Sequence, residues 1–262
     1  MDSMVVRDTK VGVLDKAMRI LYAFPRGDVA LTPQQIAKNT GMPLPTVYRL
    51  VQVLSEHGWL MKEGQRFRLG MTLLRLGAMV AEGIDIRSRS LPHLRWLKEQ
   101  TSENTELYIR SNESRVAIEV VRSPHNLGAF VDIGAHLPLH VGAGGKVLLA
   151  WLSDREQSDL IAASAARYSN YPLSDAQALK NALAQIRDIG WATSEGERAE
   201  EIGAIAAPIF DVSKQIVGAV VLAVPLVRLG AKERTAYVPL VCEAARRASL
   251  DMGYIEREKT EG

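Results

Sequence analysis

The feature that most constrains this chain is a register of small and apolar residues that begins at Pro33. Ala37 is the fifth residue of this segment, Gly41 is the ninth and Val47 is the fifteenth. Two helices that cross closely need a small residue at the crossing, and the turn between them needs a residue that tolerates a left-handed backbone. The second helix then needs an apolar residue that faces the first. The segment meets these three requirements in the correct order, which indicates a helix-turn-helix.

Local signals mark the ends of the helices around this register. Residues 14–24 place an apolar stripe on one face of a first helix. Thr32 and Gln35 have the T-x-x-Q spacing of a capping box, and a proline suits the first turn of the second helix. The third helix begins around residues 43–45, and Gly58 supplies the glycine that commonly follows a helix C-terminus. Three short helices are therefore predicted before residue 59.

A β-hairpin with basic residues is expected next. The segment WLMKEGQRFRLG has two short apolar stretches around a Glu63-Gly64 turn. The exposed face of the third helix carries hydrogen-bonding side chains and few acids, and such groups reach base edges or phosphates in the major groove. These features predict a winged helix-turn-helix that binds double-stranded DNA, with a module used only for protein contacts as the alternative. The predicted DNA contacts are Thr32, Gln34, Thr46, Tyr48, Arg49, Gln52, Arg66 and Arg68.

The charge distribution agrees with a nucleic-acid-binding N-terminal segment. Residues 1–75 contain 11 Lys and Arg against 6 Asp and Glu, whereas the remaining residues contain 21 against 24. No apolar run approaches the roughly 18 residues of a membrane-spanning helix. The N-terminus lacks the apolar segment of a secretory signal. The single cysteine, Cys242, excludes an internal disulfide. We therefore expect a cytoplasmic protein with no membrane partner.

The C-terminal two thirds of the chain predicts an α+β domain. From Asn104 the segments TELYIRS, RVAIEVVRS and LGAFVDIG read as short β-rich pieces. The segments IGAIAAPIFD and QIVGAVVLAVP predict an antiparallel pair joined by residues 212–214. Strands, helices, strands and a last helix around a mostly antiparallel sheet form an α+β layout typical of sensors. Helices are expected over 71–87, 154–164, 174–189 and 231–254, and the tail is expected to be disordered.

Specific segments resemble the IclR family of transcriptional regulators over nearly the whole chain. They are LDKAMRILYAF, LTPQQIAKNTGMPLPTVYRLVQVLSEHGWL, RFRLG, LPLHVGAGGKVLLAWL, GWATSEGE and IGAIAAPIFDVSKQIVGAVVLAV. The resemblance implies a winged helix-turn-helix over residues 1–70, a linker helix over 71–88, a GAF-like effector-binding domain over 89–255 and a tail over 256–262. The sequence departs from the family pattern at the start of the third helix. The family usually has a polar or basic residue followed by a serine there, and this chain has Leu44 and Pro45.

The GAGGK segment predicts an anion-binding loop rather than a nucleotide-binding one. The Walker pattern fails because His140 stands where the first glycine is required and Val147 where Ser or Thr is required. Backbone amides of Ala143, Gly144 and Gly145 at the start of a helix can still bind an anion. A tight turn against the sheet is a compatible alternative. The resemblance implies that this loop holds the carboxylate of an effector.

Most pocket positions implied by the resemblance carry apolar side chains in this sequence. Ser194 stands at a position where relatives have a carboxylate, Ala204 at a thiol position, and Val221 and Ala223 at two serine positions. Because unpaired polar groups are costly to bury, this composition favours an aromatic or hydrophobic carboxylate over glyoxylate. The effector-binding residues implied are Ala129, Leu137, Ala143, Gly144, Gly145, Ser194, Ala204, Val221 and Ala223.

No pattern in the sequence predicts catalysis, a metal or a cofactor. Pro138 between His136 and His140 argues against a metal pair, and the glutamates of residues 195–201 fit a solvated loop. We therefore expect a ligand-responsive bacterial regulator, a repressor acting as a homodimer or homotetramer, because one winged helix covers only a short site. The alternatives are a protein-interaction sensor and an enzyme with a helical N-terminal extension.

Overall fold

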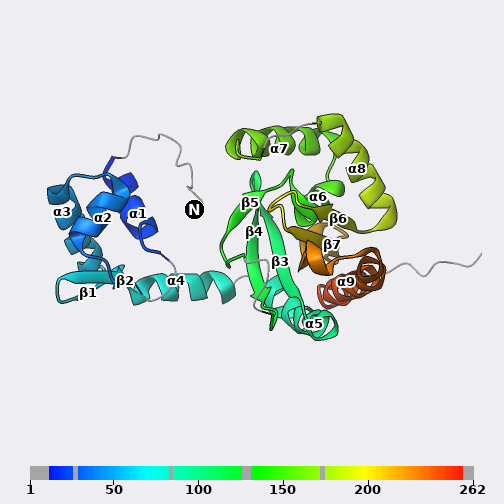
Figure 1. The fold of residues 1–262 in the computed structure, drawn as a ribbon, viewed down its shortest axis with the longest axis horizontal. Helices are drawn as coiled ribbons and strands as arrows, with labels where there is room; N and C mark the ends of the chain where they lie inside the picture. Colours follow the sequence, from blue (N-terminus) through cyan, green and yellow to red (C-terminus); the bar gives the residue numbers. More distant parts are fainter. Residues whose placement is uncertain (1–11, 26–28, 83–84, 126–130, 172–174, 256–262) are drawn as a thin grey trace, which may run out of the picture. The chain divides into compact units, whose positions relative to one another are not determined.

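Four helices and a two-stranded hairpin make up the described residues of the N-terminal unit in the computed structural model (Figure 1). The structure describes residues 12–25, 29–82, 85–125, 131–171 and 175–255, and the chain divides into two units, residues 1–84 and 85–262. The elements of the first unit are α1 (Gly12–Tyr22), α2 (Pro33–Thr40), α3 (Leu44–Glu56), β1 (Leu60–Glu63), β2 (Arg66–Leu69) and α4 (Met71–Glu82).

The predicted caps of α2 and α3 are confirmed. The Thr32 hydroxyl accepts a hydrogen bond from the Gln35 amide at 3.3 Å, and the Gln35 side chain accepts one from the Thr32 amide at 2.8 Å. Gly41 ends α2 in the left-handed conformation, with φ of 69°. At the end of α3, the amides of Gly58 and Trp59 reach back to the carbonyl oxygens of residues 55 and 54, which completes a Schellman motif.

The hairpin is an antiparallel pair that is extended by one bridge to the segment before α2. Leu60 pairs with Leu69 and Glu63 with Arg66. Leu31 and Phe67 exchange two backbone hydrogen bonds of 2.8 Å, so the hairpin is joined to the start of α2. The core of this unit contains the apolar residues Ile20, Leu31, Ile36, Met42, Val47, Leu50, Val51, Leu60 and Phe67. The helix-turn-helix and its wing therefore share one core.

The second unit is a six-stranded antiparallel sheet between two layers of helices, in agreement with the α+β prediction. Its strand order is β5-β4-β3-β8-β7-β6. In Figure 1, α5 and α9 lie on one side of the sheet and α6, α7 and α8 on the other. The elements are α5 (Asp85–Thr101), β3 (Asn104–Ser111), β4 (Ser114–Val121), β5 (His136–Pro138), α6 (Gly142–Ala150), α7 (Asp154–Arg167), α8 (Ala176–Ile189), β6 (Ala192–Glu195), β7 (Ile202–Phe210), β8 (Ile216–Pro225), the short η1 (Leu226–Arg228) and α9 (Ala231–Asp251).

Several predicted boundaries differ from the structure. The expected helix 71–87 corresponds to α4 and the first residues of α5, with residues 83–84 outside the described part. The β-rich segment expected at LGAFVDIG is not a strand over residues 131–134, and its earlier residues are not described. The strand at this edge of the sheet is instead the three-residue β5. The last helix ends at Asp251, and the tail expected to be disordered lies outside the described residues.

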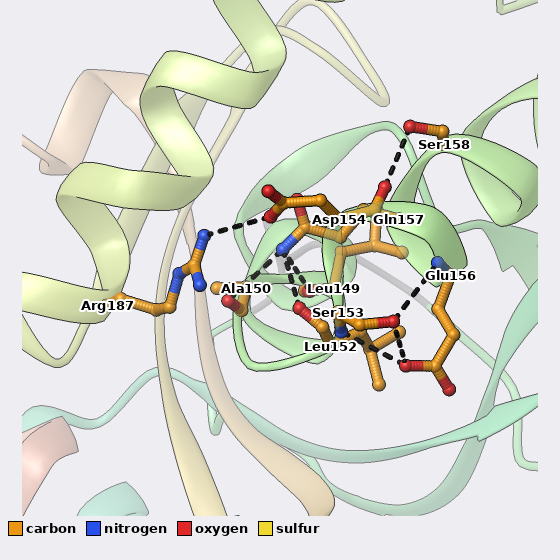
Figure 2. Close-up of polar contacts among 9 residues, drawn as sticks. All are labelled: Leu149, Ala150, Leu152, Ser153, Asp154, Glu156, Gln157, Ser158 and Arg187. Carbon is orange, nitrogen blue, oxygen red and sulfur yellow. Dashed lines mark hydrogen bonds and ion pairs between the residues drawn. The ribbon is translucent and has the colours of Figure 1, made fainter.

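The joint between α6 and α7 is held by one buried glutamine (Figure 2). Nε2 of Gln157 donates to the carbonyl oxygens of Leu149, Ala150 and Leu152 at 3.1, 3.3 and 3.1 Å. These carbonyls lie at or just after the C-terminal end of α6, where the last carbonyls of a helix lack their regular intrahelical donors, although that of Leu149 also accepts from the Leu152 amide. A capping box between Ser153 and Glu156 starts α7 beside this point. The side chain of Gln157 therefore fixes the position of α6 from its C-terminal end.

Candidate functional site

The exposed face of α3 presents the side chains that were predicted to contact DNA. Tyr48, Arg49 and Gln52 are exposed, whereas Thr46 is half-buried. Nε2 of Gln34, on α2, donates to the hydroxyl of Tyr48 at 3.2 Å. The two helices of the motif therefore present one continuous polar surface.

Two further predicted DNA contacts are already engaged within the unit. The Thr32 hydroxyl caps α2, as described above, and Arg68 forms an ion pair of 2.5 Å with Glu63 across the hairpin. Arg66 on the same hairpin is exposed. Of the residues predicted for phosphate contact, Arg49 and Arg66 are thus the most accessible.

The second unit contains a small cavity of about 20 Å³ between the sheet and the start of α6. Such a volume holds about one water molecule. The lining combines small or apolar residues with ionisable ones. It consists of Glu106, Tyr108, Arg115, Gly142, Ala143, Gly144, Ser194, Arg198, Ile202, Ala204, Val221 and Ala223.

The strand register explains why these side chains meet. Glu106 on β3 pairs with Val221 on β8, which pairs with Ala206 on β7. In the next row, Ala223 pairs with Ala204, which pairs with Ser194 on β6. Residues paired across neighbouring strands point to the same face of a sheet. The small side chains of β7 and β8 therefore leave space above the sheet that longer side chains of β3 enter.

The glycines of α6 are required for close packing. A Cβ atom at Gly144 would lie 2.9 Å from Cγ2 of Val221, and one at Gly145 would collide with the carbonyl oxygen of Leu139. Gly142 has φ of 77°, a conformation that favours glycine. Gly144 and Gly145 therefore lie within α6 rather than in a tight turn, and their lack of a side chain allows close packing against Val221 and Leu139.

Two amides at the N-terminus of α6 are engaged by side chains of the same chain. The amide of Ala143 donates to Oγ of Ser194 at 3.0 Å. The amide of Gly142 donates to Oε2 of Glu197 at 2.8 Å, and Nζ of Lys146 lies 2.5 Å from Oε1 of that carboxylate. The loop is thus able to bind a carboxylate, and Glu197 supplies one here. Glu197 is exposed on its loop, in agreement with the predicted solvated loop, and it also accepts a hydrogen bond at the start of α6.

The cavity lining contains a group of ionisable or phenolic side chains, here called the polar cluster: the buried Glu106, Tyr108 and Arg115 and the half-buried Arg198. The Tyr108 hydroxyl donates to Oε2 of Glu106 at 2.7 Å, and the Arg115 guanidinium lies 5.2 Å from the centre of the Tyr108 ring. Arg115 also donates from Nη1 to the carbonyl oxygens of Pro138 and Val141. The cluster is therefore held in place by the strands and by the turn before α6.

Burial dominates the electrostatics of this cluster. It raises the pKa of Glu106, while the positive charge of Arg198, the Tyr108 hydrogen bond and Arg115 act in the opposite direction. Burial also lowers the pKa of Arg115 and raises that of Tyr108. A charged group that is buried away from water is costly unless it is paired. These side chains are therefore unlike the apolar residues that usually fill a protein core.

The structure brings together six of the effector positions expected from the sequence: Ala143, Gly144, Ser194, Ala204, Val221 and Ala223. Gly145 packs against Leu139, and Leu137 lies in the hydrophobic core of the unit. Ala129 lies outside the described residues.

The expectation of an apolar pocket is corrected by the polar cluster. None of its four residues was predicted as a site residue, although Glu106, Tyr108 and Arg115 lie in the predicted strand segments TELYIRS and RVAIEVVRS. One sequence feature could have indicated them. Polar and apolar residues alternate in TELYIRS, and this alternation places Glu106 and Tyr108 on the same face of one strand.

Other titratable groups have partners of their own. Nδ1 of His136 lies 2.9 Å from Oγ of Ser114, and His140 contacts Oγ of Ser164 and the carbonyl oxygen of Tyr171. Cys242 is half-buried, and its burial raises the pKa of the thiol. Over the described part of the chain, no group of three or more His, Cys, Asp and Glu residues could hold a metal ion, and no helix is long and apolar enough to cross a membrane.

Two family models match the chain. Residues 13–64 match the IclR helix-turn-helix domain, and residues 78–250 match the C-terminal domain of bacterial transcriptional regulators of the IclR type. The regulator XynR of Escherichia coli is 29% identical over 92% of this chain and 97% of its own length. The Escherichia coli repressor IclR is 26% identical over 93% of this chain and 91% of its own length.

Solved structures share the fold. A Thermotoga maritima IclR matches with a TM-score of 0.78 and 23% identity, covering 92% of this chain and 98% of the other. An IclR homologue from Microbacterium hydrocarbonoxydans, solved in complex with 4-hydroxybenzoate, matches with a TM-score of 0.76 and 22% identity over 92% and 99% of the two chains.

Proposed function

This chain belongs to the IclR family of transcriptional regulators, a family of non-enzymes, and on that premise we propose that a small organic carboxylate controls its binding to operator DNA. The observation that carries the proposal is a cavity lined by buried ionisable groups in a unit separate from an exposed helix-turn-helix face. Buried charges of this kind are stabilised by a ligand of complementary charge. The C-terminal unit is thus the sensor and the N-terminal unit the DNA reader.

Three features of the cavity support a carboxylate. The N-terminus of α6 offers backbone amides, and it already holds the carboxylate of Glu197. Arg198, the next residue, adds positive charge to the cavity lining. The side chains of Ile202, Ala204 and Val221 supply apolar lining, and we propose that the cavity enlarges beyond its present volume of about 20 Å³ when an aromatic or hydrophobic body enters. The related Microbacterium protein was solved with an aromatic carboxylate, which agrees with this ligand class.

We further propose that the chain works as a homodimer or homotetramer and represses its target. A symmetric operator needs paired DNA-reading units. In the single chain, apolar side chains on α1 and α4 are exposed, including Leu14 at 55%, Leu74 at 64% and Met79 at 62%. An apolar surface of this kind is available for subunit contacts. The Escherichia coli relatives IclR and AllR are named repressors, which supports repression. Operator binding places the protein in the cytoplasm.

The test is a fluorescence-anisotropy titration of the full chain against the DNA upstream of its own operon, with unrelated DNA of equal length as the control. We expect specific binding, and we expect a shift in affinity of about 5–150-fold when a suitable carboxylate is added. Benzoate, 4-hydroxybenzoate, glyoxylate and pyruvate are the first acids to compare. Equal binding to both DNAs would overturn the proposal and favour a sensor that acts only through protein contacts.

A further inference from the structure

The exposed face of α3 begins with a proline. Residues spaced three or four apart lie on one face of a helix. Four residues of α3 with this spacing are all exposed: Pro45, Tyr48, Arg49 and Gln52. The buried residues of α3 lie on the opposite face, toward the core of the unit. Pro45 therefore extends the face predicted to contact DNA to the N-terminal end of the helix.

The start of α3 has few hydrogen-bond donors. Pro43 and Pro45 have no amide N–H. The amides of Thr46 and Val47 both donate to the carbonyl oxygen of Pro43, at 3.0 and 3.2 Å. The side chains of Leu44 and Pro45 have no polar atom. A helix N-terminus commonly binds phosphate through its backbone amides, and this one has little of that capacity.

The charge of α3 nevertheless favours DNA as the molecule that covers its exposed face. The only acidic residue of the helix is its last one, Glu56, and residues 1–75 contain 11 Lys and Arg against 6 Asp and Glu. In a helix-turn-helix, the residues near the N-terminus of the second helix contact base edges in the major groove. Pro45 is exposed at that position and is therefore expected to meet a base edge.

Thymine is the base whose major-groove edge suits a proline ring. The four base pairs present hydrogen-bond donors and acceptors there, and thymine adds an apolar 5-methyl group. The ring of Pro45 cannot form a hydrogen bond, but it can pack against a methyl group. We propose that Pro45 determines part of the operator specificity by contacting the methyl group of a thymine. This inference rests on the proposed function only in that the chain must bind operator DNA, and it requires no effector.

The test begins with the full chain selecting its preferred duplex from a random-sequence library. Fluorescence anisotropy then compares this duplex with variants in which one thymine at a time is replaced by uracil, which differs only by lacking the methyl group. We expect a loss in affinity of about fourfold at the contacted thymine, because burial of one methyl group contributes about that much. Uracil at thymines outside the contact should change the affinity by less than about 1.5-fold.

A second pair of bases separates the methyl group from hydrogen bonding. Cytosine presents a donor where thymine presents an acceptor, and 5-methylcytosine adds only the methyl group to it. At the contacted position, 5-methylcytosine should bind more tightly than cytosine by about the same fourfold factor. Equal affinity for these two bases would contradict a methyl contact.

Protein variants assign the contact to Pro45. In Pro45→Ser the loss caused by uracil should fall below about twofold, because the hydroxyl group replaces the apolar ring. Pro45→Val is the matched control, since it also restores the backbone N–H but keeps an apolar side chain, and it should retain a clear preference for thymine. Val53→Ser changes another exposed apolar residue, two turns along α3, and should retain the wild-type loss at the same thymine. Melting temperatures check that each variant folds.

The outcomes separate this inference from the proposed function. Specific binding of the selected duplex with no thymine sensitive to uracil would overturn the inference and leave the DNA-binding regulator standing. A loss that is unchanged in Pro45→Ser would overturn the role of Pro45. Should that variant fail to fold, Pro45→Asn replaces it, because asparagine is tolerated at helix starts. A chain that selects no duplex from the library would overturn both the inference and operator binding.

Discussion

Oε2 of Glu197 accepts a hydrogen bond of 2.8 Å from the backbone amide of Gly142, the first residue of α6. The other oxygen of this carboxylate forms an ion pair with Lys146. An internal carboxylate thus lies where the sequence predicted the carboxylate of an effector. A ligand that uses the same amide must displace Glu197.

We therefore expect Glu197→Gln to bind a small carboxylate more tightly than the wild type. The neutral amide competes less well for the positive end of α6 and for Lys146, and the gain should be about threefold to tenfold. Calorimetry with the tightest-binding acid measures it. Glu195→Gln is the control, because Glu195 pairs with Arg234 instead of α6. Weaker binding by Glu197→Gln would contradict competition between Glu197 and the ligand. It would indicate instead that Glu197 stabilises the ligand-bound state.

Arg49→Ala should weaken operator binding without lowering the melting temperature. Arg49 is exposed on α3, so its loss removes a contact to DNA but no core packing. If the contact is to a phosphate, the slope of log affinity against log salt concentration should fall by about 0.9. Anisotropy titrations at several salt concentrations measure the slope. Arg155→Ala, which removes a 93% exposed arginine on α7, should leave both affinity and slope unchanged. Unchanged affinity in Arg49→Ala would contradict docking through α3.

Light scattering should give a mass of at least twice the 28.8 kDa of one chain at micromolar concentration. Leu74→Asp should lower this mass, because it places a charge on the exposed apolar surface of α4. Val227→Asp introduces the same charge at a residue that is 84% exposed in the other unit, and it should not change the mass. A monomeric wild-type chain would rule out the proposed assembly.

Gln157→Leu should destabilise the second unit by about 1–3 kcal/mol, because carbonyl oxygens at the end of α6 lose their buried donor. Denaturant unfolding measures the change. Gln177→Leu is the matched control, since Gln177 is exposed and its side chain donates to Asn181 on the same helix, while its backbone bond to Asp175 does not depend on the side chain. If both substitutions cost the same, Gln157 does not hold the α6–α7 joint.

Glu106 should make stability depend on pH in the direction opposite to that of a surface carboxylate. Its pKa is raised above 4.5 by burial, so the native state binds more protons than the unfolded state between 4.5 and the raised value. Stability from this group is therefore lost as pH rises through that window. Glu106→Gln does not titrate, so its melting temperature relative to the wild type should be higher at about pH 8 than at about pH 5. A constant difference would contradict the raised pKa.

The sequence by itself determined the elements whose causes are local. The capping box of Thr32 and Gln35, the left-handed Gly41 and the Schellman motif at Gly58 each involve residues within a few positions of one another. The hairpin turn and the β7–β8 pair have the same local origin. Hence the winged helix-turn-helix and the mostly antiparallel sheet were predictable, with errors of a few residues at helix ends and at β5.

Only the tertiary structure decided the chemistry of the cavity. Glu106 and Arg115 come from two strands whose register shifts between Leu107 and Tyr108, and a shift of one residue reverses the face to which a side chain points. Glu197, which lies next to Arg198 in the loop, is 55 residues along the chain from Gly142, the first residue of α6. The sequence gives no measure of such distances, because burial and charge pairing arise only after distant segments pack together. That packing is what turned an expected apolar pocket into one lined by a buried carboxylate and two arginines.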